Sequence, residues 1–493
     1  MLEAILSGLA SLLSPIPLAM LLVGVGVGLA TGLLPGLGTT TAFALLLPFL
    51  FTMTPVAAFS LLMGILAVDT TVSAITAILY SIPTAAGSAA TVADGYAMTQ
   101  RGEAARAIGA GIFSSALGGI FAALMLGASV PLLRPLILSF GSPEQLMIVL
   151  VGIAFISSLG GRSPVKGWLS GGLGLLLATV GLDLQTSTER FTLGSLYLWN
   201  GLPLLPVLIG LFAIPEIVEL AVKGTSLAVV DKIALGKAGV WEGFKDSLRH
   251  WKVTVRSSLI GTIFGIIPGL GPGAASFVAY GDAVQSSKEP ERFGKGAPEG
   301  VIAAETANNA ASEAGLIPTV AFGVPGTIAM AVFLGALTIH GVTPGIDLLT
   351  QQTEVIYAMM WALLIANVIG AAISLALANP LARITYVRGS LIIPFLLVLV
   401  FIGSFAANNS LSDIVTLIVF GLFGHVMKAS NWPRVPLVLG LILGKQAEKY
   451  FTISFTNWGL GFLSRPAVIA MLLLSFLVSI YPLLRRGNGG PRL

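Results

Sequence analysis

The chain has 493 residues, of which 55% are hydrophobic and 10% are charged, and its formal net charge is +4. A soluble globular protein carries about a quarter charged residues, so this composition excludes a cytosolic enzyme. The sequence contains no cysteine, which excludes disulfide bonds, thiolate metal sites and thiol nucleophiles. The small net charge suggests orientation in a membrane and gives no reason to expect nucleic-acid binding.

Apolar stretches of roughly 20 residues recur along the chain, and each could cross a hydrocarbon core of about 30 Å. The stretches at residues 146–156 and 391–401 are apolar on every side, unlike the alternating strands of a barrel. The sequence therefore predicts an all-α polytopic membrane protein with about 12 transmembrane or re-entrant helices. No A-x-A cleavage site follows the first apolar run, so we expect the N-terminus to be retained.

The first interrupted helix is expected within residues 20–42. Glycines recur every four residues from Gly24 to Gly36, so they line one helix face and let another backbone approach closely. The sequence Pro-Gly-Leu-Gly at residues 35–38 then ends the helix, because proline removes a backbone donor and glycine permits positive φ. The next helix begins with three threonines, whose hydroxyls and free N–H groups suit an anion.

A polar triplet, Asp69-Thr70-Thr71, interrupts the apolar run at residues 61–79. Hard cations prefer carboxylate and hydroxyl oxygens, and an ionisable group at membrane depth is a functional candidate by default. The triplet therefore indicates a cation-binding role for Asp69 and Thr70.

The long polar connector at residues 223–256 carries seven basic and three acidic residues. The positive-inside rule places it in the cytoplasm with the basic segments at residues 101–106, 288–295, 383–388 and 485–492. The connectors at residues 341–353 and 404–412 lack Lys and Arg, so we assign them to the outside. We interpret the central connector as a solvated linker with an amphipathic helix on the membrane. It divides the chain into an N-terminal half (1–222), a connector (223–256) and a C-terminal half (257–493).

The two halves repeat the interruption. A shift of 233 residues aligns residues 28–42 with 261–275, with seven identities in fifteen positions. A weaker match aligns residues 81–84 with 323–327 at a shift of 242. Most of the 59 glycines need only helix packing as their explanation, but packing gives no reason to break both halves at one point. Paired breaks of this kind are typical of transporters built from inverted repeats, with the binding site near the midplane.

A second polar cluster follows at residues 305–313. Glu305, Asn308, Asn309 and Ser312 fall at spacings of three and four, which predicts that they share one helix face. That face offers carboxylate, amide and hydroxyl oxygens to a cation or substrate. The alternative is an interfacial helix with its polar face in water, for which two adjacent asparagines are unusual.

These motifs together resemble the large membrane subunit of the tripartite tricarboxylate transporters. The similarity rests on Gly32-Leu-Leu-Pro-Gly-Leu-Gly38 and Gly265-Ile-Ile-Pro-Gly-Leu-Gly271, and on residues 73–83, 94–102, 291–300, 305–310, 322–327 and 334–345. It is collinear from about residue 20 to 480. The chain departs from the family beside the expected site, with Thr84 in place of glycine after the proline and Asp69-Thr70-Thr71 in place of a glycine-rich stretch.

The resemblance implies a cation-coupled secondary transporter that takes up a di- or tricarboxylate across a bacterial inner membrane. Its partners would be a small membrane subunit and a periplasmic solute-binding protein that delivers the substrate. The sequence has no G-x-x-x-x-G-K-[ST] phosphate loop, which agrees with coupling to sodium or protons in place of ATP. We expect no cofactor and no metal apart from a coupling sodium ion.

We expect a mobile core, containing both breaks and residues 305–312, to pack against a stationary scaffold. The candidate substrate-binding residues are Thr39, Thr40, Thr41, Gly273, Ala274, Ser276, Asn308, Asn309, Pro325, Gly326 and Thr327. The candidate cation ligands are Gly36, Gly38, Asp69, Thr70, Gly269, Gly271 and Glu305. No Lys or Arg adjoins the breaks, so we expect helix termini and co-transported cations to offset the charge of the substrate.

Three alternatives remain at this stage. An anion channel is the most serious, because broken helices also line pores. An intramembrane enzyme is disfavoured, because H-E-x-x-H is absent and the three histidines, His250, His340 and His425, are far apart in sequence. A membrane receptor would bind a periplasmic partner without moving solute.

Overall fold

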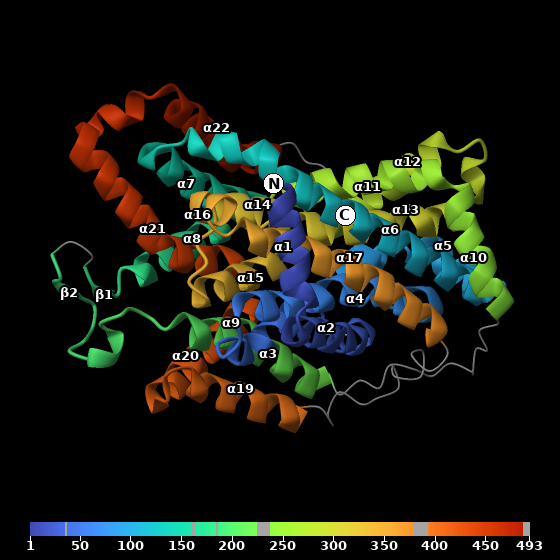
Figure 1. Cartoon of the computed structure of the whole chain (residues 1–493), viewed down its shortest axis with the longest axis horizontal. Coiled ribbons are helices and arrows are strands. Elements are labelled where there is room, and N and C mark those ends of the chain that lie inside the picture. Colours follow the sequence, from blue (N-terminus) through green and yellow to red (C-terminus); the bar gives the residue numbers. More distant parts are fainter. Residues whose placement is uncertain (35–36, 160–162, 184–185, 224–236, 379–392, 487–493) are drawn as a thin grey trace.

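The computed structural model describes the whole chain apart from residues 35–36, 160–162, 184–185, 224–236, 379–392 and 487–493 (Figure 1). The described chain is almost entirely helical, with one short antiparallel pair, β1 (Gly181–Leu182) and β2 (Glu189–Arg190). Within the described residues, six helices are long and apolar enough to cross a membrane, and one bent pair adds a seventh candidate. Five shorter apolar helices accompany them. The prediction of an all-α polytopic membrane protein is confirmed.

The helices of the first half are α1 (Leu2–Leu13), α2 (Pro15–Leu33), α3 (Thr39–Leu50), α4 (Pro55–Tyr80), α5 (Val92–Gln100), α6 (Ala104–Leu138), α7 (Ser142–Leu159), α8 (Pro164–Ala178) and α9 (Leu204–Lys223). From the connector onward they are α10 (Lys237–Arg249), α11 (Trp251–Ile266), α12 (Gly271–Ser286), α13 (Pro298–Ala314), α14 (Leu316–Phe322), α15 (Ile328–Ile339), α16 (Ile346–Thr350), α17 (Thr353–Ala376), α19 (Ile393–Asn408), α20 (Leu411–Ala429), α21 (Arg434–Trp458) and α22 (Pro466–Arg486). Short 3₁₀ turns include η1 (Ala86–Ala89) and η3 (Pro290–Arg292).

Both interruptions lie where the sequence predicts them. The first separates α2 from α3, and the second separates α11 from α12. At the second break Gly269 and Gly271 have φ of 86° and 65°, values that favour glycine. The weaker repeat also has a common geometry, because Ser81 ends α4 and Gly323 ends α14 in the left-handed conformation, with φ of 57° and 68°.

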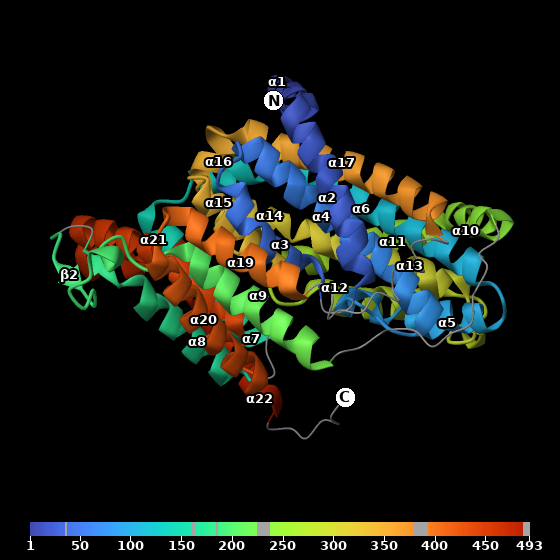
Figure 2. The ribbon, with the colours of Figure 1, turned by 90° about the horizontal axis from the view of Figure 1, so that it is seen from below.

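The described helices form two groups (Figure 2). In one group α4 packs against α2, α6 and α17, and α13 packs against α6, α11 and α12. In the other group α20 packs against α9, and α21 and α22 pack against α7 and α8. Helices α3 and α15 lie between the groups and contact α9. Because α13 packs on α6, the two sequence halves interlock within the first group.

The contact between α2 and α4 depends on glycine. Residues 57–79 of α4 are all buried. A Cβ atom at Gly24 would lie 2.2 Å from the carbonyl oxygen of Leu61, and one at Gly64 would lie 2.6 Å from that of Leu21. The two backbones therefore touch, as the four-residue spacing of glycines predicts.

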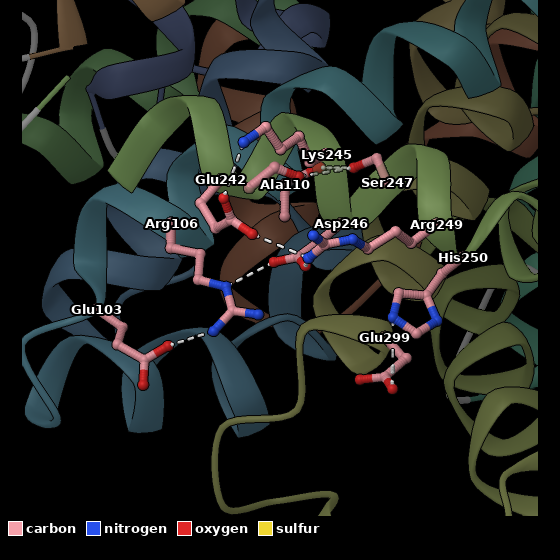
Figure 3. Close-up of polar contacts among 11 residues, drawn as sticks. Glu103, Arg106, Ala110, Glu242, Lys245, Asp246, Ser247, Arg249, His250 and Glu299 are labelled. Atoms are coloured by element: carbon pink, nitrogen blue, oxygen red, sulfur yellow. Dashed lines mark hydrogen bonds and ion pairs between the residues drawn. The ribbon is translucent and has the colours of Figure 1, made fainter. Parts of the chain in front are cut away.

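The described part of the connector is a docked helix. A Cβ atom at Gly243 would lie 2.0 Å from the carbonyl oxygen of Arg106, so α10 lies directly on α6. Arg106 Nε donates to Asp246 Oδ2 at 2.6 Å (Figure 3). Glycine contacts and the ion pair with Arg106 hold α10 against the protein, so this part of the connector is not a free linker, and an amphipathic helix on the membrane stays a prediction.

Three of the basic segments assigned to one side of the membrane lie together. Arg106 of the segment at residues 101–106 contacts α10 of the connector (Figure 3). His250 Nε2 of the connector lies 3.7 Å from Glu299 Oε1, just after the segment at residues 288–295. Hydrogen bonds from Lys245 and Arg249 lower the pKa of Glu242 in the same patch. Residues 383–388, and nearly all of 485–492, fall outside the described residues. The grouping agrees with a common side for the first three segments.

We predict that Gly24→Ala destabilises the protein, because its methyl group would meet the backbone of α4. The expected loss is about 1–3 kcal/mol, seen as a lower melting temperature of the purified protein in detergent. Gly26→Ala is the matched control on the same helix, because no atom lies within 4 Å of a Cβ atom there. Equal melting temperatures for the two variants would contradict the close contact.

Candidate functional site

A cavity of about 740 Å³ lies where the two helix breaks and the two turns after α4 and α14 meet. Helix α13 adds to its lining, and α9, α20 and α21 supply the opposite wall. The predicted site residues that line it are Gly38, Thr39, Thr40, Thr41, Asp69, Thr70, Gly269, Gly271, Gly273, Asn308, Pro325, Gly326 and Thr327. The fold thus brings together residues that are up to 289 positions apart in the sequence, from Gly38 to Thr327.

Four of the described predicted residues do not belong to this lining, and a fifth predicted residue is not described. Gly36 lies outside the described residues. Ala274 and Ser276 lie in the first turn of α12, where Ser276 Oγ donates to its own helix at Gly273 O (3.0 Å). Glu305 is fully buried and accepts hydrogen bonds from Thr91 and Asn308. Asn309 is directed toward α4, α6 and α17.

At the first break a carboxylate of the protein occupies the helix N-terminus. Thr39 N and Thr39 Oγ1 donate to Asp69 Oδ2 at 3.1 and 2.6 Å, and Thr31 Oγ1 donates to Oδ1 at 2.7 Å. Asp69 is only 3% exposed. The donors of Thr39, which the sequence predicts as substrate contacts, therefore already hold the carboxyl group of Asp69.

The second break has no such carboxylate. No side chain among the described residues caps α12. A Cβ atom at Gly271 would meet nothing within 4 Å, and one at Gly273 would lie 3.3 Å from Ala86 Cβ. The N-terminus of α12 is therefore open to the cavity, whereas that of α3 is filled. This difference between the two halves follows from one side chain, that of Asp69.

The two turns close the breaks. Thr84 Oγ1 donates to the carbonyl oxygen of Gly32 at the end of α2 (3.0 Å), and Gly269 N donates to the carbonyl oxygen of Gly326 (3.4 Å). Across the halves, Asn308 Oδ1 lies so near Gly87 that a Cβ atom there would be 1.7 Å away. Each released backbone group named here thus finds a partner inside the protein, as a break at membrane depth requires.

The opposite wall carries two cations. Lys428 Nζ lies 2.6 Å from Glu216 Oε2, and Arg434 Nη2 lies 3.3 Å from Glu216 Oε1. The expectation that no Lys or Arg lies at the site is therefore wrong. No local pattern predicts these two cations, because Lys428 and Arg434 follow the second break by more than 150 residues and reach it only through the packing of the second group.

The cavity is suited to binding an anion. It offers the open end of α12, threonine hydroxyls, the Asn308 amide and two cations. Its charged lining residues are Asp69, Glu216, Lys428 and Arg434, whose formal charges cancel. Within the described part of the chain, no three His, Cys, Asp or Glu side chains could jointly hold a metal ion.

Comparison with known proteins agrees with this geometry. The family model described as the tripartite tricarboxylate transporter TctA family matches residues 18–439. The uncharacterized 52.8 kDa protein in the TAR-I ttuC′ 3′ region of Agrobacterium vitis is 32% identical over 443 residues, which cover 90% of this chain and 88% of that protein. An uncharacterized protein in the TAR-II ttuC′ 3′ region of the same organism is 33% identical over 190 residues, 38% of this chain and 78% of that protein.

No solved structure matches the chain. The family match covers most of the sequence, including both breaks, both turns and α13. The resemblance drawn from the motifs is confirmed, and the chain belongs to the tripartite tricarboxylate transporter TctA family.

Proposed function

We propose that the chain is a cation-coupled secondary transporter that takes up a di- or tricarboxylate across the bacterial inner membrane. A periplasmic solute-binding protein delivers the substrate, and a small membrane subunit completes the complex. The observation that carries the proposal is the single cavity formed by two helix breaks and two turns from opposite halves of the sequence. Broken helices that meet at one cavity are the usual binding architecture of secondary transporters.

One substrate carboxylate binds at the open N-terminus of α12. The first residues of α12, Gly271 to Gly273, line the cavity, and no described side chain caps this helix, so its free N–H groups are available to a carboxylate. The amide of Asn308 and the hydroxyls of Thr40 and Thr41 add hydrogen bonds. Lys428 and Arg434 supply positive charge from the facing wall.

Charge balance explains why transport is coupled. The charged lining residues cancel, so a bound dicarboxylate would leave the cavity with two negative charges in a poorly solvated site. A co-transported cation removes that cost. Carbonyl oxygens at the breaks, such as those of Gly38, Gly269 and Gly271, are candidate sodium ligands, and a buried carboxyl group is a candidate proton site.

The first experiment distinguishes a transporter from a pore. The complete three-component complex, reconstituted in vesicles, is expected to take up a labelled dicarboxylate faster when the vesicles are preloaded with the unlabelled compound. An open channel would show no stimulation by preloading, and this result would overturn the proposal.

Within the same assay we expect Gly273→Val to reduce exchange at least about tenfold, because a Cβ atom there would already lie 3.3 Å from Ala86 Cβ, and the larger side chain would displace the turn that lines the cavity beside the N-terminus of α12. Gly281→Val on the same helix is the matched control, since nothing lies within 4 Å of a Cβ atom there. Equal exchange by both variants would show that the N-terminus of α12 is not part of the binding site.

Asp69 provides a prediction about substrate charge. Replacing it by asparagine removes one negative charge from the cavity wall and keeps the shape of the side chain. Affinity for a tricarboxylate should rise about tenfold relative to a monocarboxylate, since a unit charge nearby contributes on the order of 1–2 kcal/mol. The measurement is KM for each substrate. Asp347→Asn, at an exposed position in α16, is the control. An unchanged ratio would show that Asp69 does not set the charge of the substrate.

A further inference from the structure

A buried polar cluster formed by four helices lies on the side of α13 that faces away from the cavity. It contains Asn309 and Glu313 of α13, Asn367 of α17, Thr71 of α4 and Ser115 of α6, and each of them is at most 1% exposed. The sequence predicts a substrate-binding role for Asn309, and Glu313 ends the polar run at residues 305–313 without a predicted role. Four helices enclose the cluster, so its members must satisfy one another.

The hydrogen-bond donors of the cluster are fully used. Asn309 Nδ2 donates toward Asn367 Oδ1 (2.9 Å), Ser115 O (3.0 Å) and Thr71 Oγ1 (3.2 Å). Asn367 Nδ2 donates to Glu313 Oε1 (2.6 Å) and to the carbonyl oxygen of Leu363 (2.9 Å). Ser115 donates to Thr71, which donates to the carbonyl oxygen of Ala67. These contacts fix the orientation of the Asn309 and Asn367 amides, and every side-chain donor of the cluster has an acceptor.

Two acceptors remain without a partner. Asn309 Oδ1 and Glu313 Oε2 are buried and accept no hydrogen bond from the described residues. They belong to residues four apart on one helix, so they lie on the same face. An unpaired buried acceptor costs about 1–3 kcal/mol, and an unpaired buried carboxylate costs more.

No cation compensates a charge on Glu313. Among the described residues, the only hydrogen bond to its side chain comes from Asn367, and no Lys, Arg or His forms an ion pair with it. The charged groups of the surrounding helices are occupied elsewhere or exposed: Asp69 with Thr39, Asp94 with Tyr280, Arg106 with Asp246, Arg256 with Asp282, Glu299 with Arg292, Glu354 with Ser11, and the exposed Arg134 and Lys252.

We propose that Glu313 Oε2 binds the coupling proton and donates it to Asn309 Oδ1. A single proton gives both unpaired acceptors a partner and neutralises the carboxyl group. A hard cation would need about six oxygen ligands, and the cluster offers two free side-chain oxygens. The assignment rests on the proposed function, and it names the proton as the coupling ion.

The position of Glu313 connects the proton to the substrate. Asn308 and Ser312 line the cavity, and their immediate neighbours in sequence, Asn309 and Glu313, form the proton site. A shift of α13 along α17 would break the hydrogen bond between Asn367 and Glu313, which would expose an unsatisfied carboxyl group. Protonation therefore favours one position of the helix whose other face contacts the substrate.

The test is Glu313→Gln in the reconstituted complex. Glutamine is neutral and nearly the same shape, so exchange of labelled for unlabelled dicarboxylate should stay within about twofold of the wild type. Accumulation driven by a pH gradient should fall at least about tenfold. Infrared difference spectra on pH change should lose the band of a protonated carboxyl group. Glu289→Gln, at an exposed position, is the matched control.

Other results separate the two proposals. Wild-type accumulation driven by a pH gradient and unchanged in Glu313→Gln would overturn the proton site while leaving the transporter intact. Accumulation that depends on sodium alone would overturn it as well. A wild-type complex without counterflow would overturn the transport proposal, and the infrared band would still test protonation of Glu313. If Glu313→Gln fails to fold, Glu313→Asp is expected to retain accumulation with a shifted pH profile, and an unshifted profile would contradict the assignment.

Discussion

The structure depends on satisfying the backbone groups that two helix breaks release in an apolar surrounding. In hydrocarbon a free N–H or C=O group needs a partner from the protein unless it lines a cavity. Thr84 provides one for the end of α2, Gly326 provides one for Gly269, and Asp69 provides one for Thr39. Because the partners come from the turns after α4 and α14, these helices must lie beside the breaks, and the cavity follows from that placement.

One side chain makes the two halves unequal. Both halves repeat the break and the turn, yet only the first holds a carboxylate at its new helix. A duplicated fold with two equivalent anion sites would favour a substrate with negative groups at both ends. With Asp69 at the first of them, the proposed substrate site keeps the open end of α12 and the wall that carries Lys428 and Arg434.

The sequence predicted those parts of the fold that local backbone chemistry determines. The breaks, the glycine face of α2 and the turns at residues 81–84 and 323–327 were predicted because proline and glycine determine the local backbone, whereas the partner of the glycine face, α4, was not. It could not predict that Lys428 and Arg434 reach the cavity, or that α10 docks on α6, because both depend on packing between distant segments. Asn308 and Asn309 illustrate the limit: adjacent residues point about 100° apart on a helix, and only neighbouring helices decide which of them faces the cavity.

The contact between Asp69 and Thr39 has an electrical consequence. Asp69 is joined by hydrogen bonds to residues on both sides of the first break, and α4 is locked to α2 by backbone contact. Any movement that carries the break across the membrane must also carry the carboxylate of Asp69. When that group is ionised, the empty carrier moves a negative charge on its return, and each 100 mV of membrane potential changes the energy of that step by up to about 2.3 kcal/mol. The voltage across the membrane would then set the rate at which the unloaded protein turns around.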